Sequence, residues 1–331
     1  MVRGLRIALV GAAAALTMGP LANAKPVTAA VSPAVVSTDQ FPALKGMFPG
    51  GVVGHPDVVY SMIPGYRPMT LDLYVSPKGH EPKPLVIYVH GGGWTGGTAR
   101  NAGAFANFPG VLADLASRGY VVASLNYRLA GEARAPAASE DVDAAIRWLK
   151  GHAAQYGIDK RRVAIWGGSA GGQLAGLAAT DCSAGDGKTE SDCVQAAVIW
   201  YGVFDFTSLG RGAPPRPAAA GSRPAGGPAG FLGCAPEACP DIAKAQSPIA
   251  HVEASTPPML LIYGSEDRTV PPDQSRAMAA KLKAAGVRSD SIELPGVDHS
   301  FIGHTPAATQ AASLRALEAT FDWFDATVGK R

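Results

Sequence analysis

A pentapeptide of the pattern G-x-S-x-G lies near the middle of the chain. It runs from Gly167 to Gly171 with Ser169 at its centre, directly after the apolar run Val163–Trp166 and before a helix-like stretch. A serine nucleophile needs a sharp strand-to-helix turn that holds its oxygen clear of the sheet, and glycines must flank so crowded a backbone. A phosphate loop would need Gly-Lys followed by Ser or Thr, and the dinucleotide fingerprint G-x-G-x-x-G does not fit. The pattern therefore predicts Ser169 as a nucleophile.

Three consecutive glycines end a second apolar run. The segment His90-Gly91-Gly92-Gly93-Trp94 closes the stretch Leu85–His90. Consecutive glycines leave amides exposed and let the backbone approach a substrate closely, as an oxyanion hole requires when a carbonyl carbon becomes tetrahedral. We expect His90 to fix this loop by hydrogen bonding rather than to act as a base. The helix that begins at Ala170 would point further free amides at developing negative charge.

The acid and the base should follow the serine in the order acid, then histidine. Asp267 follows the strand-like run Met259–Tyr263, and His299 follows Ser291–Leu294. Both would lie on loops at the carboxyl ends of successive strands, where open α/β sheets place their sites. We therefore predict His299 as the base and Asp267 as the acid that orients it. Three other carboxylates compete for the role of the acid: Glu266, Asp273 and Asp298.

Apolar runs and amphipathic stretches alternate along the chain and predict the elements that carry these loops. Continuous apolar runs such as Leu85–His90 are typical of strands buried on both faces, whereas the alternation at Thr70–Val75 predicts an edge strand with one wet face. Further strands are expected at 120–127, 162–166, 196–201, 259–263 and 291–294, and helices at 110–118, 139–156, 170–180, 272–285 and 309–327. Ser139 should cap the second of these helices. The alternation predicts an α/β fold, with a mostly parallel sheet and helices on both faces.

The alternation stops between Phe204 and Pro258, before the strand that carries the acid, and we expect an insertion there. Its middle, Arg211–Gly230, consists almost wholly of Ala, Gly, Pro, Arg and Ser, which predicts a mobile surface tract without a packed helix. Its apolar residues, among them Phe206 and Phe231, are scattered rather than set at helical spacing. A lipase lid needs a broad apolar face, so no lid of that kind is expected.

The first 24 residues have the composition of an export signal. A short cationic start to Arg6 precedes an apolar run, and Ala22-Asn23-Ala24 supplies a cleavage pattern of small residues. The apolar run is too short for a membrane span, which needs about 20 residues. We therefore expect cleavage after Ala24 and a single mature domain over residues 25–331, secreted or periplasmic.

The four cysteines agree with an oxidising compartment, where disulfides persist. Four cysteines allow three pairings, of which we favour the sequence-local pairs Cys182–Cys193 and Cys234–Cys239, since each would close a short loop. Zinc is the alternative, but the sequence has no C-x-x-C and no paired histidines near the cysteines.

The composition excludes several other classes of protein. Of the 331 residues, 47% are hydrophobic and 17% are charged, which fits a globular protein rather than a disordered one. The net charge is +2, and removal of a leader that holds Arg3 and Arg6 leaves the mature chain near neutral. Because there is also no basic stripe, we expect no binding of nucleic acid or of anionic membrane surfaces. No stretch after the leader is long and apolar enough to span a bilayer, so we expect no stable insertion into a membrane.

These motifs together resemble those of α/β-hydrolase-fold esterases. Within that fold the chain resembles the acetylxylan/feruloyl esterase-type group, a neighbour of the hormone-sensitive-lipase-like esterases, from about Thr70 to the C-terminus, apart from the Arg211–Gly230 tract. The resemblance rests on the glycine loop, the G-x-S-x-G turn, the Asp267 and His299 loops, the Leu232-Gly233-Cys234…Cys239-Pro240 stretch and Asn126-Tyr127-Arg128-Leu129. Gly168 stands where the lipase-like pattern often has an Asp before the serine, which counts against lipid esters.

The resemblance implies Ser169 as nucleophile, His299 as base and Asp267 as the orienting acid. It also implies an oxyanion hole made of the amides of three residues: Gly92, Gly93 and Ala170.

The predicted function is that of an exported carboxylic ester hydrolase that forms an acyl-enzyme and needs no metal or cofactor. Its substrates would be short acyl or aromatic esters, small or linked to a polysaccharide, and Trp94 and Tyr201 would offer aromatic faces near the reacting carbonyl. An amide-directed serine hydrolase, either a peptidase or a formamidase, could use the same residues. A non-catalytic binding protein on this fold is disfavoured, because the serine and the histidine are intact. The sequence predicts no particular oligomeric state.

Overall fold

The structure is a computed structural model that describes residues 45–77, 79, 81–186, 189–209 and 226–329. These residues are built around a nine-stranded sheet with the strand order β1-β2-β3-β5-β4-β6-β7-β8-β9. The expected leader over residues 1–24 lies outside the described residues, and so do residues 211–225 of the expected mobile tract.

Six neighbouring strands are parallel and carry every loop that the sequence analysis singled out. In sheet order they are β5 (Val121–Leu125), β4 (Lys83–Val89), β6 (Ile158–Gly168), β7 (Ala196–Trp200), β8 (Met259–Gly264) and β9 (Ser289–Leu294). Strands β4, β5, β7 and β8 are buried along their whole length, which explains their continuous apolar runs. Because all six run in the same direction, their carboxyl ends meet at one edge of the sheet.

Three antiparallel strands extend the sheet beyond β5. They are β1 (Gly46–Met47), β2 (Val53–Ser61) and β3 (Met69–Val75). The prediction of an edge strand at 70–75 is wrong, because β3 lies between β2 and β5 and is mostly buried. The sequence does not predict strand β2, because a bulge at Pro56 and Asp57 interrupts its register with β3. Asp57 has a φ of +54° in this bulge.

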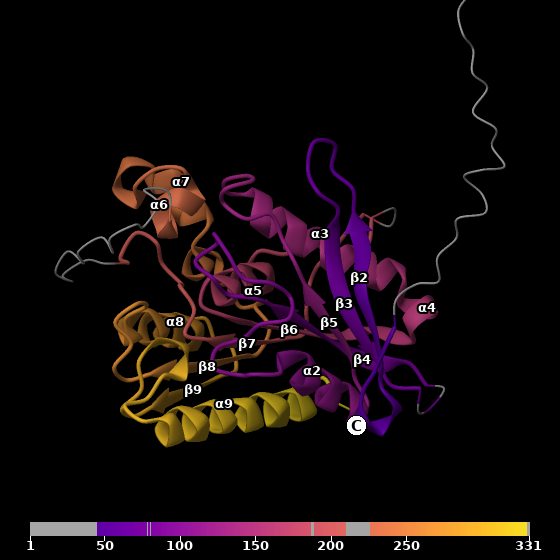
Figure 1. The fold of residues 1–331 in the computed structure, drawn as a ribbon. Helices are drawn as coiled ribbons and strands as arrows, with labels where there is room; N and C mark the ends of the chain where they lie inside the picture. The colour runs from indigo at the N-terminus through magenta and orange to yellow at the C-terminus, as the bar shows by residue number, and fades with distance from the viewer. Residues whose placement is uncertain (1–44, 78, 80, 187–188, 210–225, 330–331) are drawn as a thin grey trace, which may run out of the picture. The chain divides into compact units, whose positions relative to one another are not determined.

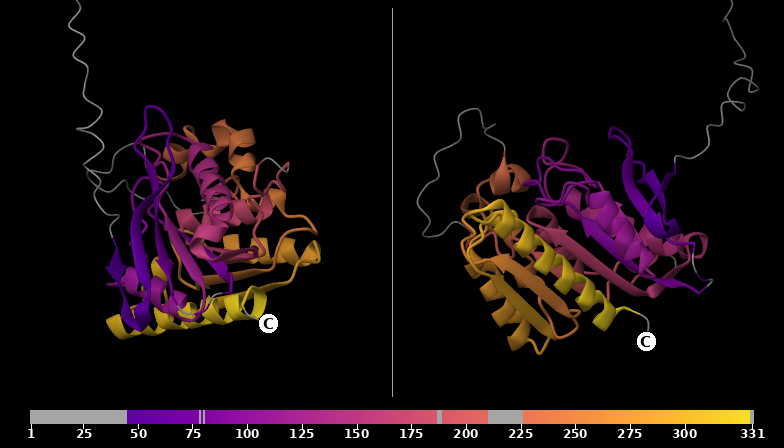
Figure 2. Two further views of the ribbon diagram at one scale, coloured as in Figure 1. Left: turned by 90° about the vertical axis from the view of Figure 1, so that its right-hand side faces the viewer. Right: turned by 60° about the horizontal axis from the view of Figure 1, so that its bottom comes forward.

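Helices cover both faces of the sheet, as predicted (Figures 1 and 2). One face carries α3 (Ala137–Gly151), α5 (Ala170–Thr180) and α8 (Pro272–Ala284), and the other carries α2 (Phe108–Ser117) and α9 (Pro306–Thr327). The right-hand view of Figure 2 shows α9, in yellow, running across its face of the sheet.

Helix α3 begins two residues earlier than predicted. It starts at Ala137, and Ser139 lies inside its first turn, where the hydroxyl donates a hydrogen bond of 2.7 Å to the carbonyl oxygen of Pro136. Ser139 is therefore not the N-cap. The short helix α4 (Ala153–Tyr156) follows α3 as a separate element.

The segment between β7 and β8 packs against the same face as α5. It contains the helices α6 (Gly227–Leu232) and α7 (Pro240–Ala245) and the 3-10 turns η2 (Pro236–Ala238) and η3 (Pro248–His251). The expectation of no packed helix in 211–230 is wrong for its last residues, because α6 has a proline in its first turn and buries Phe231 and Leu232 in the core. Phe204 and Phe206 are buried in that core as well.

Both predicted disulfides are present. Cys182–Cys193 closes the loop between α5 and β7, and Cys234–Cys239 links the end of α6 to the start of α7. The zinc alternative is therefore wrong, because all four cysteines are paired. None of the described helices combines the length and the apolar character that a bilayer crossing requires.

Candidate active site

Ser169 lies at the turn from β6 into α5, at the carboxyl edge of the parallel strands. Its φ of +57° and ψ of −122° lie outside the regions that side-chain-bearing residues favour, so the turn is sharp. The packing is so close that a Cβ on Gly171 would lie 2.1 Å from the carbonyl oxygen of Val89. Glycine is therefore required at position 171, and the predicted strand–turn–helix context is confirmed.

His299 and Asp267 lie beside Ser169 and complete a chain of hydrogen bonds. Nε2 of His299 is 2.8 Å from Oγ of Ser169, and Nδ1 is 2.8 Å from Oδ2 of Asp267. Asp267 follows β8, and His299 begins the 3-10 turn η4 (His299–Phe301) after β9. The side chain of Asp267 is fully buried and that of His299 is 17% exposed. These two hydrogen bonds therefore connect a buried carboxylate to a serine at the edge of a cleft.

The carboxylate of Asp267 is fixed by two backbone amides. Its Oδ1 accepts hydrogen bonds from the amides of Thr269 at 2.9 Å and Val270 at 2.8 Å, which leaves Oδ2 for His299. Since an ionised carboxylate can only accept hydrogen bonds, Nδ1 of His299 must donate. Nε2 then carries the lone pair and can take the proton of Ser169.

The three competing carboxylates have other partners than the imidazole of His299. Asp298 accepts hydrogen bonds from the backbone and the guanidinium of Arg268. Glu266 lies 3.0 Å from Nε2 of His304, and Asp273 forms an ion pair with Arg276. Among the carboxylates that the structure describes, only that of Asp267 contacts the imidazole beside Ser169.

The glycine loop after β4 lies against the turn at Ser169. A Cβ on Gly91 would lie 2.7 Å from the carbonyl oxygen of the residue before Ser169, so the two segments are in backbone contact. Gly92 and Gly93 line the same cleft as Ser169, and within the described part of the chain their amides donate no hydrogen bond to other protein groups. The amide of Ala170, in the first turn of α5, has no intrahelical acceptor either. These donors can serve an oxygen bound beside the serine.

His90 fixes the glycine loop, as predicted. Its Nδ1 donates to the carbonyl oxygen of Gly91 at 2.8 Å, and its ring stacks on that of Tyr127 with centroids 4.4 Å apart. The hydroxyl of Tyr127 in turn donates to the carbonyl oxygen of His90 at 2.9 Å. Burial lowers the pKa of His90 to about 4, so the ring is neutral at pH 7.

Of the two aromatic residues predicted near the reacting carbonyl, only Tyr201 lines the cleft. Its ring meets that of His299 edge-on, with centroids 4.8 Å apart. The prediction for Trp94 is wrong, because this residue is only 3% exposed and its ring stacks on Phe231 at 4.9 Å. Its Nε1 donates to Oε1 of Gln173 at 2.9 Å. Because the Trp94 indole has an aromatic partner and a hydrogen-bond acceptor in the protein interior, it contributes to the packing of the core and does not line the cleft.

Gln173 supports the site, although none of the sequence motifs predicts a role for it. It is fully buried, accepts the hydrogen bond from Trp94, and donates from Nε2 to the carbonyl oxygen of Gln246 at 2.8 Å. It therefore ties the glycine loop to the insertion, one helical turn after Ser169. Its role could have been suspected from its residue type, because Gln173 is the one long polar side chain in α5, a helix otherwise built of Ala, Gly, Leu and a terminal Thr.

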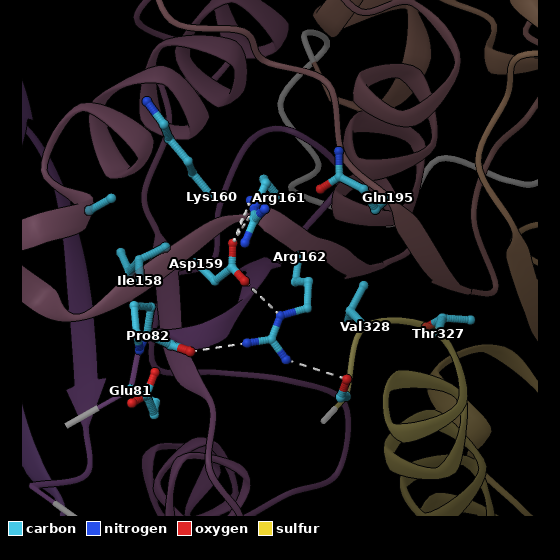
Figure 3. Close-up of a pocket in the computed structure, with 12 residues that line it drawn as sticks. Glu81, Pro82, Ile158, Asp159, Lys160, Arg161, Arg162, Gln195, Thr327 and Val328 are labelled. Atoms are coloured by element: carbon cyan, nitrogen blue, oxygen red, sulfur yellow. Dashed lines mark hydrogen bonds and ion pairs between the residues drawn. The ribbon is translucent and has the colours of Figure 1, made fainter. Parts of the chain in front are cut away.

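The cleft around Ser169 has a volume of about 410 Å³, and no Asp, Glu, Lys or Arg lines it. A larger hollow of about 1130 Å³ lies at the opposite end of β6 (Figure 3). There the guanidinium of Arg162 donates to Asp159 and to the carbonyl oxygens of Pro82 and Gly329, so this cation joins the end of the chain's last helix to the start of β4. The residues that line this hollow include no serine, cysteine or histidine.

Curated relatives of the chain include esterases. Esterase LipQ of Mycobacterium tuberculosis is 32% identical over 287 residues, which cover 83% of this chain and 63% of that protein. Esterase LipC of the same organism is 34% identical over 238 residues. The chain spans 53–63% of the length of the first three curated relatives that it matches.

Solved structures agree with the fold. A truncated carbohydrate esterase from gut microbiota has a TM-score of 0.67 at 26% identity, with 84% of this chain and 96% of that one covered. The butyrate-bound esterase Est2 of the Planctomycetes species Thermogutta terrifontis has a TM-score of 0.64 at 26% identity, with 82% and 92% covered. The predicted α/β-hydrolase fold is confirmed by these neighbours and by the mostly parallel sheet. Since the BD-FAE family model matches residues 71–282, well over half of the sequence, the chain belongs to the BD-FAE family.

Proposed function

We propose that this protein is an exported carboxylic ester hydrolase in which Ser169 is the nucleophile, His299 the base and Asp267 the acid that orients the base. The observation that carries the proposal is the unbroken chain of two hydrogen bonds, each 2.8 Å long, from Oγ of Ser169 through the imidazole to the buried carboxylate. A nucleophile within hydrogen-bonding reach of a base, which is itself oriented by a third group, is the arrangement of serine hydrolases.

Acylation begins with transfer of the Ser169 hydroxyl proton to Nε2 of His299. The serine oxygen attacks the ester carbonyl carbon as the carbonyl π bond opens, and the resulting oxyanion is bound by the amides of Gly92, Gly93 and Ala170. The α5 helix adds its positive end to these donors. Collapse of the tetrahedral intermediate expels the alcohol, which takes the proton from His299 and leaves an acyl group on Ser169.

Deacylation repeats the same steps with water as the nucleophile. His299 removes a proton from water, the hydroxide oxygen attacks the acyl carbon, and the same amides bind the second oxyanion. The intermediate then collapses, the proton returns from Nε2 to the serine oxygen, and the carboxylic acid leaves.

The substrates we propose are esters of short or aromatic acyl groups, including those carried by carbohydrates. A cleft of about 410 Å³ without Asp, Glu, Lys or Arg suits a small neutral acyl group, and Tyr201 offers an aromatic wall beside His299. Among the described residues of the insertion, Phe206, Phe231 and Leu232 are at most 3% exposed, and a single exposed large hydrophobic residue, Ile242, does not make a lid. Each buried CH₂ is worth ~0.8 kcal/mol only where an apolar groove receives it. The carbohydrate-esterase and butyrate-bound neighbours support the same class of substrate.

Export is supported by the two disulfides, since disulfides persist in oxidising compartments.

The test is kcat/KM along a series of 4-nitrophenyl esters from acetate to decanoate, together with a feruloyl ester. We expect the acetate, butyrate or feruloyl ester to be preferred and Ser169→Ala to be inactive on each of them. A rise in kcat/KM towards the decanoate, or activation at a lipid interface, would favour a lipase instead. Absence of hydrolysis of every ester would overturn the proposal.

A further inference from the structure

Two oppositely charged residues stand next to the proposed acid and base. Arg268 directly follows Asp267, and Asp298 directly precedes His299. The loops that carry them start from the paired ends of β8 and β9, where Gly264 lies opposite Leu294. A contact between these two residues therefore joins the two loops at the point where the acid must meet the base.

The two oxygens of Asp298 have separate partners. Oδ1 accepts hydrogen bonds from two backbone amides, that of Arg268 at 2.9 Å and that of His299 at 2.7 Å. Oδ2 accepts from the guanidinium of Arg268, from Nε at 2.9 Å and from Nη2 at 2.7 Å. One oxygen thus bridges the main chains of both loops, while the other holds a side chain that is 83% exposed.

The His299 loop needs such an anchor because its backbone is unusual. Ser300 and Phe301, which follow His299, have φ values of +61° and +59°, a region that non-glycine residues rarely adopt. So strained a segment persists only where contacts with the surrounding structure hold it in place. Other bonds between the loops, such as that from the Glu266 amide to the carbonyl oxygen of Val297 at 3.0 Å, do not reach the amide of His299.

We propose that Asp298 is a positioning residue, whose Oδ1 clamps the backbone amides of Arg268 and His299 and thereby holds the base against the acid and the nucleophile. This inference rests on the proposed function of His299. The exposed ion pair through Oδ2 contributes little, because solvent and salt screen it. The clamp acts through the main chain, so it survives loss of the Arg268 side chain.

Three variants separate the clamp from the ion pair. Asp298→Ala removes both, whereas Asp298→Asn keeps a carbonyl oxygen for the two amides, and Arg268→Ala keeps both amides and removes only the guanidinium. Arg276→Ala is the matched control, because Arg276 also forms a bidentate ion pair, with Glu293 at 3.0 Å, and lies outside the two loops.

We expect kcat on 4-nitrophenyl acetate to fall by roughly 10- to 100-fold in Asp298→Ala, since a displacement of about 1 Å near the chemistry can cost about 100-fold. KM should change by less than about threefold. Asp298→Asn and Arg268→Ala should each lose less than about threefold in kcat, as expected for a screened surface pair, and Arg276→Ala should match the wild type. If Asp298→Ala does not fold, Asp298→Ser, whose hydroxyl accepts fewer bonds, should give a loss between those of Asn and Ala.

A loss of less than about threefold in both Asp298→Ala and Asp298→Ser would overturn the inference. Equal losses in Asp298→Ala and Arg268→Ala would also overturn it, because the ion pair rather than the amide clamp would then be responsible. A loss in Asp298→Asn as large as that in Asp298→Ala would overturn it too, because the negative charge rather than the hydrogen bonds to the two amides would then be required.

A second measurement does not depend on ester hydrolysis and so tests the clamp even if the proposed function fails. In protein labelled with ¹⁵N-histidine, the Nδ1 proton of His299 is identified by its loss in Asp267→Asn. We expect this resonance to persist in Asp298→Asn and Arg268→Ala, and to broaden through solvent exchange in Asp298→Ala. An unchanged resonance in Asp298→Ala would refute the clamp, whereas an inert wild-type enzyme with the expected resonances would refute only the function.

Discussion

Asp267→Asn should lower kcat by about 10⁴-fold while leaving the protein folded. In the structure, Oδ1 of Asp267 accepts from the amides of Thr269 and Val270, and Oδ2 faces Nδ1 of His299. An asparagine can keep its carbonyl oxygen on the two amides, which places its NH₂ group against Nδ1. Nδ1 must then accept, the ring proton moves to Nε2, and no lone pair remains for the hydroxyl of Ser169.

The magnitude follows from the change of tautomer rather than from lost packing. A factor of 10⁴ corresponds to about 5.4 kcal/mol at 1.36 kcal/mol for each tenfold change in rate. The effect on the free energy of unfolding should be smaller, because the two amide hydrogen bonds are kept and each is worth about 1 kcal/mol.

The assay is steady-state hydrolysis of 4-nitrophenyl acetate at pH 7.5, with thermal unfolding recorded to show that the variant is folded. Asp298→Asn is the matched control, since it makes the same chemical change one residue before His299 and should retain kcat within about threefold. A loss below about tenfold in a folded Asp267→Asn protein would contradict the assignment of the acid. A larger loss in Asp298→Asn than in Asp267→Asn would show that the wrong carboxylate was chosen.

Three further predictions concern other parts of the chain. Ser169→Ala should abolish hydrolysis and change Tm by less than about 2 °C, because a hydroxyl at the edge of a cleft contributes little to the core; residual turnover near the wild-type rate would exclude it as the nucleophile. Trp94→Phe should cost about 1–3 kcal/mol of unfolding free energy by leaving the buried Oε1 of Gln173 without a donor, and a large rise in KM would show that the ring touches substrate after all. Burial and the nearby carboxylate of Asp192 raise the pKa of Asp143 to about 7. The unfolded chain releases that proton near pH 4, so the free energy of unfolding should fall as the pH rises from about 4 to 7. Asp143→Asn removes the ionisable group and should therefore raise Tm by at least about 3 °C at pH 8 but not at pH 4.5.

The sequence was most informative where one local rule decides the structure. The buried parallel strands give continuous apolar runs, and α5 was predicted with the bounds that it has in the structure, because the G-x-S-x-G turn fixes where a helix can begin. The order serine, acid, histidine then placed Asp267 and His299 on adjacent strand ends. The disulfide pairs followed from short spacings alone.

Predictions failed where the partner of a residue is distant in the chain. Trp94 follows three glycines and was expected at the cleft, but its ring packs on Phe231, which belongs to the insertion more than a hundred residues later. The alternation in β3 predicts an edge strand, but in the structure β2 pairs with that edge. Strand β2 is hard to predict from the sequence because a bulge interrupts it. In both cases the local pattern gave no information about the distant segment that covers the residues.

The choice between Asp267 and Asp298 shows what the neighbour adds. Both carboxylates lie on loops beside the same histidine, so residue type and chain order could not separate them. The register of β8 and β9, with Gly264 opposite Leu294, brings the two loops into backbone contact and places Arg268 beside Asp298. The carboxylate that bridges Arg268 and two amides has a side chain 28% exposed, which fits the proposed clamp, whereas the fully buried one that faces the imidazole fits the proposed orienting acid. The sequence did carry a signal for the contact between the two loops, as a cation directly after one candidate acid and an anion directly before the candidate base, but it gave none for the hydrogen bonds of Asp298 to the two backbone amides.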